Sequence, residues 1–76
     1  MSNVFIPDYG FAAVMKAGLA TQEDVNKFVN DVGNDYKGKW EPVSGGYTVH
    51  IEDEPTAIKL SNDIHDLLDD WVDTLE

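Results

Sequence analysis

Apolar residues follow helical spacing near both ends of the chain and alternate with polar residues in its middle. A first helix is predicted over residues 7–18, where Phe11, Val14 and Met15 would share an inner face. A second helix is predicted to begin after Thr21, because threonine is a good N-cap residue and two acids follow it. The apolar stripe of this second helix comprises Val25, Phe28, Val29, Val32 and Tyr36.

The middle of the chain predicts a β-hairpin. Residues 39–44 and 47–52 flank Gly45 and Gly46, and two glycines between alternating segments favour a type I′ turn. Pro42 cannot donate a hydrogen bond to a neighbouring strand, so its strand should lie at a sheet edge.

The two-glycine turn also predicts the register of the hairpin. Ser44 would pair with Tyr47, and Trp40 would face the core. Glu41 and His50 would then meet on the opposite face of the sheet.

Alternation of Thr56, Ile58 and Leu60 predicts a third strand over residues 56–60. The chain should therefore fold as one α+β domain over residues 1–76. Its expected elements are two N-terminal helices, a three-stranded antiparallel meander and a C-terminal amphipathic acidic helix.

The C-terminal helix has the clearest pattern in the chain. Ser61 is its expected N-cap, and apolar and acidic positions would occupy separate arcs of about 140° each. The apolar arc contains Ile64, Leu67, Leu68, Trp71, Val72 and Leu75. The acidic arc contains Asp63, Asp66, Asp69, Asp70, Asp73 and Glu76.

Charge narrows the range of partners. Fifteen acids against five lysines, without arginine, give a net charge of −10 at pH 7. Binding to nucleic acid or to an anionic membrane requires basic side chains, so neither is expected. The absence of cysteine suits a reducing compartment. The start of the chain lacks a signal-peptide pattern, and no apolar stretch could span a bilayer. A cytoplasmic protein is therefore expected.

The C-terminal acids would destabilise an isolated helix. Asp66 with Asp70, and Asp69 with Asp73, are like-charge pairs four residues apart, and no lysine follows residue 60 to compensate them. Carboxylates near the C-terminus also oppose the helix dipole. We therefore predict that these charges bind a basic partner, with an acidic turn extending the surface. The predicted partner-binding residues are Asp63, Asp66, Asp69, Asp70, Asp73, Glu76, Glu52, Asp53 and Glu54.

Other chemistry has little support in the sequence. Residues 62–73 contain clustered acids but no glycine, unlike a calcium-binding loop. His50 and His65 lie on different predicted elements, and no serine stands in a catalytic pattern. We expect no enzyme activity, no metal site and no cofactor.

A short, cysteine-free, strongly acidic chain with a segregated acidic helix resembles the small inhibitors encoded by phages and mobile elements. Within that group it most resembles anti-CRISPR proteins that mimic DNA against type I effector complexes. The resemblance covers the whole chain in size, charge and element content. It implies that the acidic helix occupies a basic channel of a CRISPR-Cas complex and blocks target DNA binding, in the host bacterial cytoplasm.

Two alternatives remain. The chain could inhibit another nuclease or DNA-binding protein through the same acids. It could instead be a small accessory interaction domain without DNA mimicry. A monomer is expected in preference to an oligomer.

Overall fold

A computed structural model describes residues 2–75, and every side chain among them except that of Tyr9. It contains three helices and a three-stranded antiparallel sheet, so the predicted α+β class is confirmed. The molecule measures 36 × 23 × 17 Å. The elements in chain order are β1 (Ser2–Pro7), α1 (Tyr9–Lys16), α2 (Gln22–Asp35), β2 (Gly38–Val43), β3 (Gly46–Ile51) and α3 (Glu54–Leu75).

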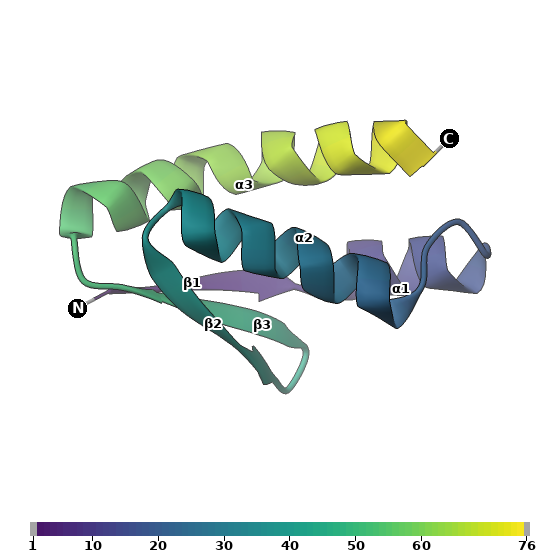
Figure 1. Ribbon diagram of the computed structural model, residues 1–76, viewed down its shortest axis with the longest axis horizontal. Helices are drawn as coiled ribbons and strands as arrows, with labels where there is room; N and C mark the ends of the chain where they lie inside the picture. Colours follow the sequence, from purple (N-terminus) through teal and green to yellow (C-terminus); the bar gives the residue numbers. More distant parts are fainter. Residues whose placement is uncertain (1, 76) are drawn as a thin grey trace.

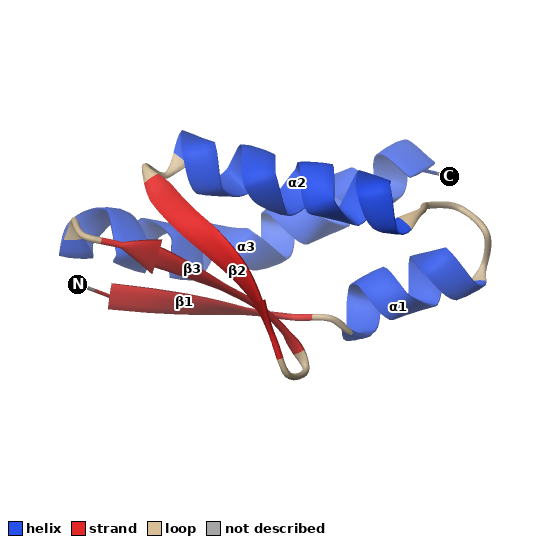
Figure 2. Ribbon diagram, turned by 60° about the horizontal axis from the view of Figure 1, so that its bottom comes forward, coloured by secondary structure: helices blue, strands red, loops and turns tan. Residues whose placement is uncertain are grey.

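The sheet has the strand order β1-β3-β2, with β3 in the centre (Figure 2). β1 pairs antiparallel with β3, placing Val4 opposite Val49 and Pro7 opposite Gly46. The prediction of a meander was wrong in this respect, because the third strand is the N-terminal segment and not residues 56–60. β1 was missed because it buries only two side chains, Val4 and Ile6, and so carries a weak alternation signal.

The helices α2 and α3 cover one face of the sheet, α2 over β2 and α3 over β1 (Figure 1). They run antiparallel, since Tyr36 at the end of α2 contacts Asp63 of α3, while Phe28 contacts Trp71 further along. The short helix α1 lies beyond the end of β1 and leads back into α2. The result is a two-layer structure whose core lies between helices and sheet.

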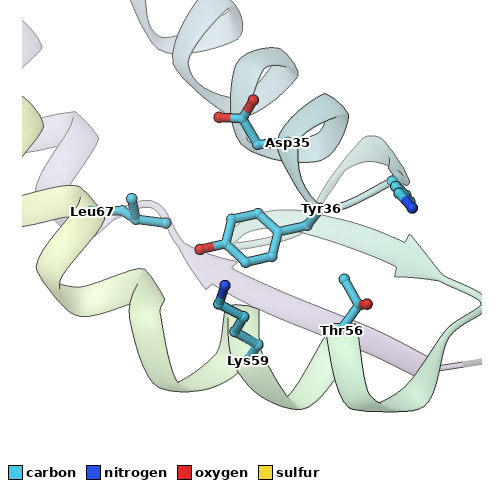
Figure 3. Close-up of a pocket in the computed structure, with 6 residues that line it drawn as sticks. Asp35, Tyr36, Thr56, Lys59 and Leu67 are labelled. Atoms are coloured by element: carbon cyan, nitrogen blue, oxygen red, sulfur yellow. The ribbon is translucent and has the colours of Figure 1, made fainter.

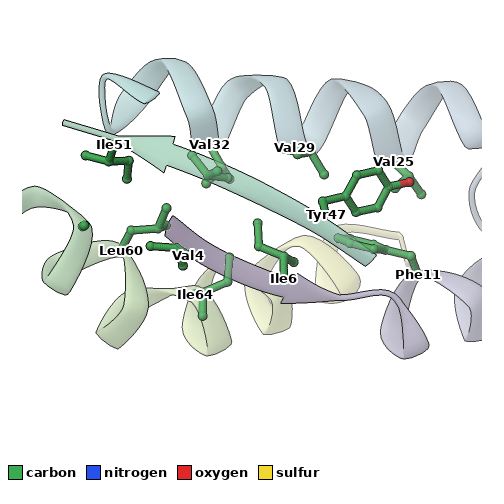
Figure 4. Packing of buried hydrophobic residues seen from close by; sticks show 12 residues of the cluster. Val4, Ile6, Phe11, Val25, Val29, Val32, Tyr47, Ile51, Leu60 and Ile64 are labelled. Atoms are coloured by element: carbon green, nitrogen blue, oxygen red, sulfur yellow. The ribbon is translucent and has the colours of Figure 1, made fainter. Parts of the chain in front are cut away.

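The buried core residues come from β1, α1, α2, β3 and α3, and β2 adds only the partly buried Trp40. Figure 4 shows core residues converging between the two layers. Alternate residues of the central strand β3 point inward, as do the predicted stripe of α2 and the predicted inner residue Phe11 of α1. Burial of such side chains stabilises each by about 1.5–3 kcal/mol relative to exposure. The fully buried large side chains are Phe11, Ile6, Ile51, Leu60, Val25, Val29 and Val49.

Helix α2 begins where the sequence predicts. The Thr21 side chain accepts a hydrogen bond from the backbone N–H of Asp24, and the Asp24 carboxylate accepts one from the backbone N–H of Thr21. This reciprocal capping box satisfies two N–H groups that a helix start leaves without partners.

Helix α3 starts eight residues earlier than predicted, so Ser61 lies within the helix and is not its cap. The cap is Asp53, whose carboxylate accepts hydrogen bonds from the backbone N–H and the hydroxyl of Thr56. Leu60 is fully buried while Ile58 is 55% exposed, which is the burial expected of one helical turn against the sheet. The alternation in residues 56–60 was therefore misleading, because β1 already occupies the edge of β3.

The hairpin forms, but its register differs from the prediction by two residues. Val43 pairs with Gly46, so Ser44 and Gly45 make the turn, and only Gly45 of these two has positive φ. The predicted type I′ turn is therefore absent. A shift of two residues preserves the faces of a strand, so Glu41 and His50 still meet, with 3.1 Å between Oε1 and Nε2.

Gly46 belongs to the strand because β1 approaches it closely. A Cβ at this position would lie 2.1 Å from the carbonyl oxygen of Ile6, and the residue has φ +158°. We expect Gly46→Ala to lower the free energy of unfolding by about 2–3 kcal/mol, measured by urea denaturation. The control is Gly10→Ala in α1, where an added Cβ meets nothing within 4 Å. It should raise stability by about 1 kcal/mol, and equal effects of the two changes would contradict the β1 pairing.

Candidate protein-interaction surface

Four of the predicted binding residues form a solvent-exposed group on the C-terminal half of α3. Asp66, Asp69, Asp70 and Asp73 are all exposed, and we refer to them as the acidic face. They span about 10 Å along the helix axis, and the row Asp66, Asp70 and Asp73 advances in steps of about 4.5–6 Å. The opposite side of the same half-helix packs on the core through Ile64, Leu67 and Trp71. The predicted segregation of acidic and apolar arcs is thus present in the structure.

The acidic face has no counter-charge within residues 2–75. The one ion pair in this part of the chain joins His50 and Glu41 on the far side of the sheet. Because α3 begins at Glu54, it does carry one lysine, Lys59, seven residues before Asp66. Lys59 therefore lies about 10 Å along the axis from the start of the acidic face, and the like-charge pairs within the face stay uncompensated.

Asp63 differs from the other acids of the predicted arc. It is half-buried, and its Oδ2 accepts a hydrogen bond of 2.9 Å from the Tyr36 hydroxyl at the end of α2. Burial raises the pKa of Tyr36 above its usual 10.0, and the hydrogen bond to Asp63 and the charges of Asp63 and Asp35 add to the rise. Asp63 thus links α2 and α3, and its carboxylate already has a hydrogen-bond partner within the chain.

One residue of the acidic turn at residues 52–54 also has hydrogen-bond partners within the chain. Asp53 caps α3, and the hydrogen bond from the Thr56 hydroxyl, followed by that from the Thr56 N–H, lowers the pKa of its carboxyl group. Glu52 and Glu54 are exposed. Twelve residues separate Glu54 from Asp66, or about 18 Å of helix axis. The structure therefore does not bring this turn and the acidic face together. Glu76 lies outside the described residues.

Positive charge gathers at the end of the molecule away from the acidic face. Lys37 and Lys59 line a surface hollow of about 390 Å³ between α2 and α3, and Figure 3 shows Lys59 in this hollow together with Tyr36. Lys37 also borders a second hollow with Lys39. Sequence reasoning missed this grouping, because residues 37–39 and 59 become neighbours only when α3 packs beside α2. The remaining residues of the first hollow are Asp35, Tyr36, Thr56 and Leu67.

The two histidines occupy separate places. His50 lies on the outer face of the sheet, with Nδ1 2.7 Å from Asn3 Oδ1 and Nε2 facing Glu41. His65 is exposed on α3. Within the described residues, no group of three or more histidine or acidic side chains is arranged to hold a metal ion.

Comparisons with protein-family models, curated protein sequences and solved structures found no match. In residues 2–75, none of the helices combines the length and apolar character needed to cross a membrane.

The contact between Tyr36 and Asp63 can be tested by Tyr36→Phe, which removes the hydroxyl donor. We expect the free energy of unfolding at pH 7 to fall by about 1 kcal/mol. A tyrosine with a raised pKa stabilises the fold while neutral, and this stabilisation is lost as pH rises above 10 through the raised value. The difference between wild type and variant should therefore shrink above pH 10 in urea titrations. An unchanged difference would show that the hydroxyl does not donate to Asp63.

The cost of the acidic face can be measured on the protein alone. Changing Asp66, Asp69, Asp70 and Asp73 to Asn removes two like-charge pairs, each worth about 0.2–0.5 kcal/mol. We expect the free energy of unfolding to rise by up to about 1 kcal/mol at low salt. The gain should vanish near 1 M salt, where the Debye length is about 3 Å. A variant less stable than wild type at low salt would mean that these acids have partners within the chain.

Proposed function

We propose that this protein is an inhibitor that binds the nucleic-acid-binding surface of another protein through its acidic face. The observation that carries the proposal is that Asp66, Asp69, Asp70 and Asp73 are exposed together on one helix without an ion-pair partner among the described residues. A small domain keeps this repulsion although Lys or Asn would relieve it. The simplest physical account is that the compensating charges lie on a partner.

The dimensions of the acidic face suit a site built for a phosphate backbone. The row Asp66, Asp70 and Asp73 advances about 4.5–6 Å per step, the same order as the 3.4 Å of axis per phosphate on one DNA strand. Attraction between this face and lysines or arginines of a nucleic-acid channel would be long-ranged and would speed association. Competition with nucleic acid for the channel follows directly, because both ligands neutralise the same cations.

The target class we propose is a type I CRISPR-Cas effector complex, on the resemblance to small acidic anti-CRISPR proteins described above. In this role the acidic face would occupy the basic channel that receives target DNA. The set of binding residues proposed here is smaller than the set predicted from the sequence. Asp53 and Asp63 have internal partners, while Glu52 and Glu54 lie at the other end of α3.

The test is a gel-shift competition between this protein and labelled target duplex for a purified type I surveillance complex. Wild type should displace the duplex, and raised salt should weaken that displacement. The variant with Asn at the four positions of the acidic face should compete at least about 100-fold less well, since each lost contact to a buried cation costs 1–3 kcal/mol.

The matched control removes four exposed acids elsewhere, by the changes Asp8→Asn, Glu23→Gln, Asp35→Asn and Glu41→Gln. It has the same net charge as the test variant. If both variants lose competition equally, net charge and not the acidic face is responsible, and the proposed site is wrong. If wild type fails to displace DNA at micromolar excess, the CRISPR target is wrong, and displacement of substrate from a basic nuclease becomes the next measurement.

A further inference from the structure

A hollow of about 270 Å³ lies between α2 and α3, at the end of the molecule away from Lys37 and Lys59. It is formed by the first half of α2 and the last turns of α3, which run antiparallel. A small-molecule site typically has about 300–1,000 Å³, so this hollow is suited to one or two side chains of a partner. Its lining residues are Asp24, Lys27, Phe28, Asp31, Trp71 and Leu75.

The floor of the hollow is a pair of aromatic rings. The rings of Phe28 and Trp71 lie 5.0 Å apart between centroids, with their planes inclined by 32°. Both residues are only partly buried. The fully buried ring of Phe11 contacts both rings edge-on, at 5.8 and 5.5 Å. This contact from the core holds the pair in place, so a partner side chain would meet an ordered aromatic surface.

The rim of the hollow is negative on balance. Asp24 and Asp31 stand seven residues apart on α2, with Lys27 between them as the one cation lining the hollow. One oxygen of Asp24 is engaged by Thr21, whereas Asp31 is exposed and has no ion pair in the described part of the chain. The C-terminal pole of α3 faces the same region, with no basic residue in its last turn. That pole is equivalent to about half a negative charge.

We propose that this hollow receives an arginine side chain of the basic partner, an inference that rests on the proposed function. Guanidinium is planar and weakly hydrated, so it can stack on the face of one of the two rings while its N–H groups reach the Asp31 carboxylate. The apolar stem of the arginine would pack against Leu75. A lysine would bring the same charge, but its ammonium is compact and strongly hydrated and gains less from an aromatic floor. The hollow would thus add selectivity for arginine to the general attraction of the acidic face.

The experiment compares short oligo-arginine and oligo-lysine peptides of equal length, titrated into the protein at moderate salt. Binding is followed by NMR through the indole N–H resonance of Trp71, assigned with the variant Trp40→Phe. Oligo-arginine should bind at least about threefold more tightly than oligo-lysine and should shift the Trp71 resonance most strongly.

Two single-charge variants on α2 provide the matched comparison. Asp31→Asn should reduce the arginine-over-lysine ratio to about one, whereas Asp35→Asn, an equal charge change outside the hollow, should leave the ratio unchanged. Neither residue has a hydrogen-bonded side-chain partner in residues 2–75, so both variants should fold. Lys27→Gln should tighten binding of both peptides by removing the cation from the rim.

Equal affinity for the two peptides, no shift of Trp71, or equal effects of Asp31→Asn and Asp35→Asn would each overturn the arginine site. These failures are separable from failure of the proposed function. The variant with Asn at the acidic face should weaken both peptides alike and keep their ratio, because it removes long-range attraction and not the aromatic floor. The DNA competition described above tests the proposed function independently of either peptide.

Discussion

The pairing of β1 with β3 is the constraint on which the rest of the structure depends. It requires the backbone of Ile6 to approach Gly46 so closely that no Cβ fits there. The pairing makes β3 the central strand and turns Val4 and Ile6 toward the helices. Helix α3 packs over β1, so the rotation of α3 about its own axis, and with it the direction of the acidic face, follows from this strand pair.

A second consequence concerns the acids themselves. Carboxylates that look alike in the sequence have three different environments. Asp53 accepts hydrogen bonds at the start of α3, and Asp63 accepts one from Tyr36 across the helix pair. Asp66, Asp69, Asp70 and Asp73 face solvent. The first two stabilise the fold at neutral pH, whereas the exposed four oppose it through mutual repulsion. Only the four exposed acids need a partner on another molecule to explain their presence.

The fold class and much of the candidate site could be predicted from local patterns. The stripe of α2 and the N-cap at Thr21 depend on neighbours within one or two turns, and both are found as predicted. The acidic face is likewise a property of one helix and its 3.6-residue period. The hairpin register and the third strand could not be predicted in this way, because both depend on β1, which lies far away in sequence. Pairing with β1 places Gly46 in the sheet, and β1 takes the edge that residues 56–60 were predicted to occupy. The aromatic hollow could not be predicted from local patterns either, because Phe28 and Trp71 are separated by 43 positions in the sequence and meet only when α2 and α3 pack together.

The sequence by itself determined the charge of this protein, the amphipathic faces of α2 and α3, and the absence of cysteine chemistry. Each of these is a composition or a local period, and no long-range contact changes it. Tertiary structure alone decided which segment completes the sheet and which side chains lie around Trp71. It also decided which acid accepts a hydrogen bond from Tyr36 and which one caps α3. The physical reason is that strand pairing and helix packing join residues whose separation along the chain no local pattern records, and burial then overrides local preference.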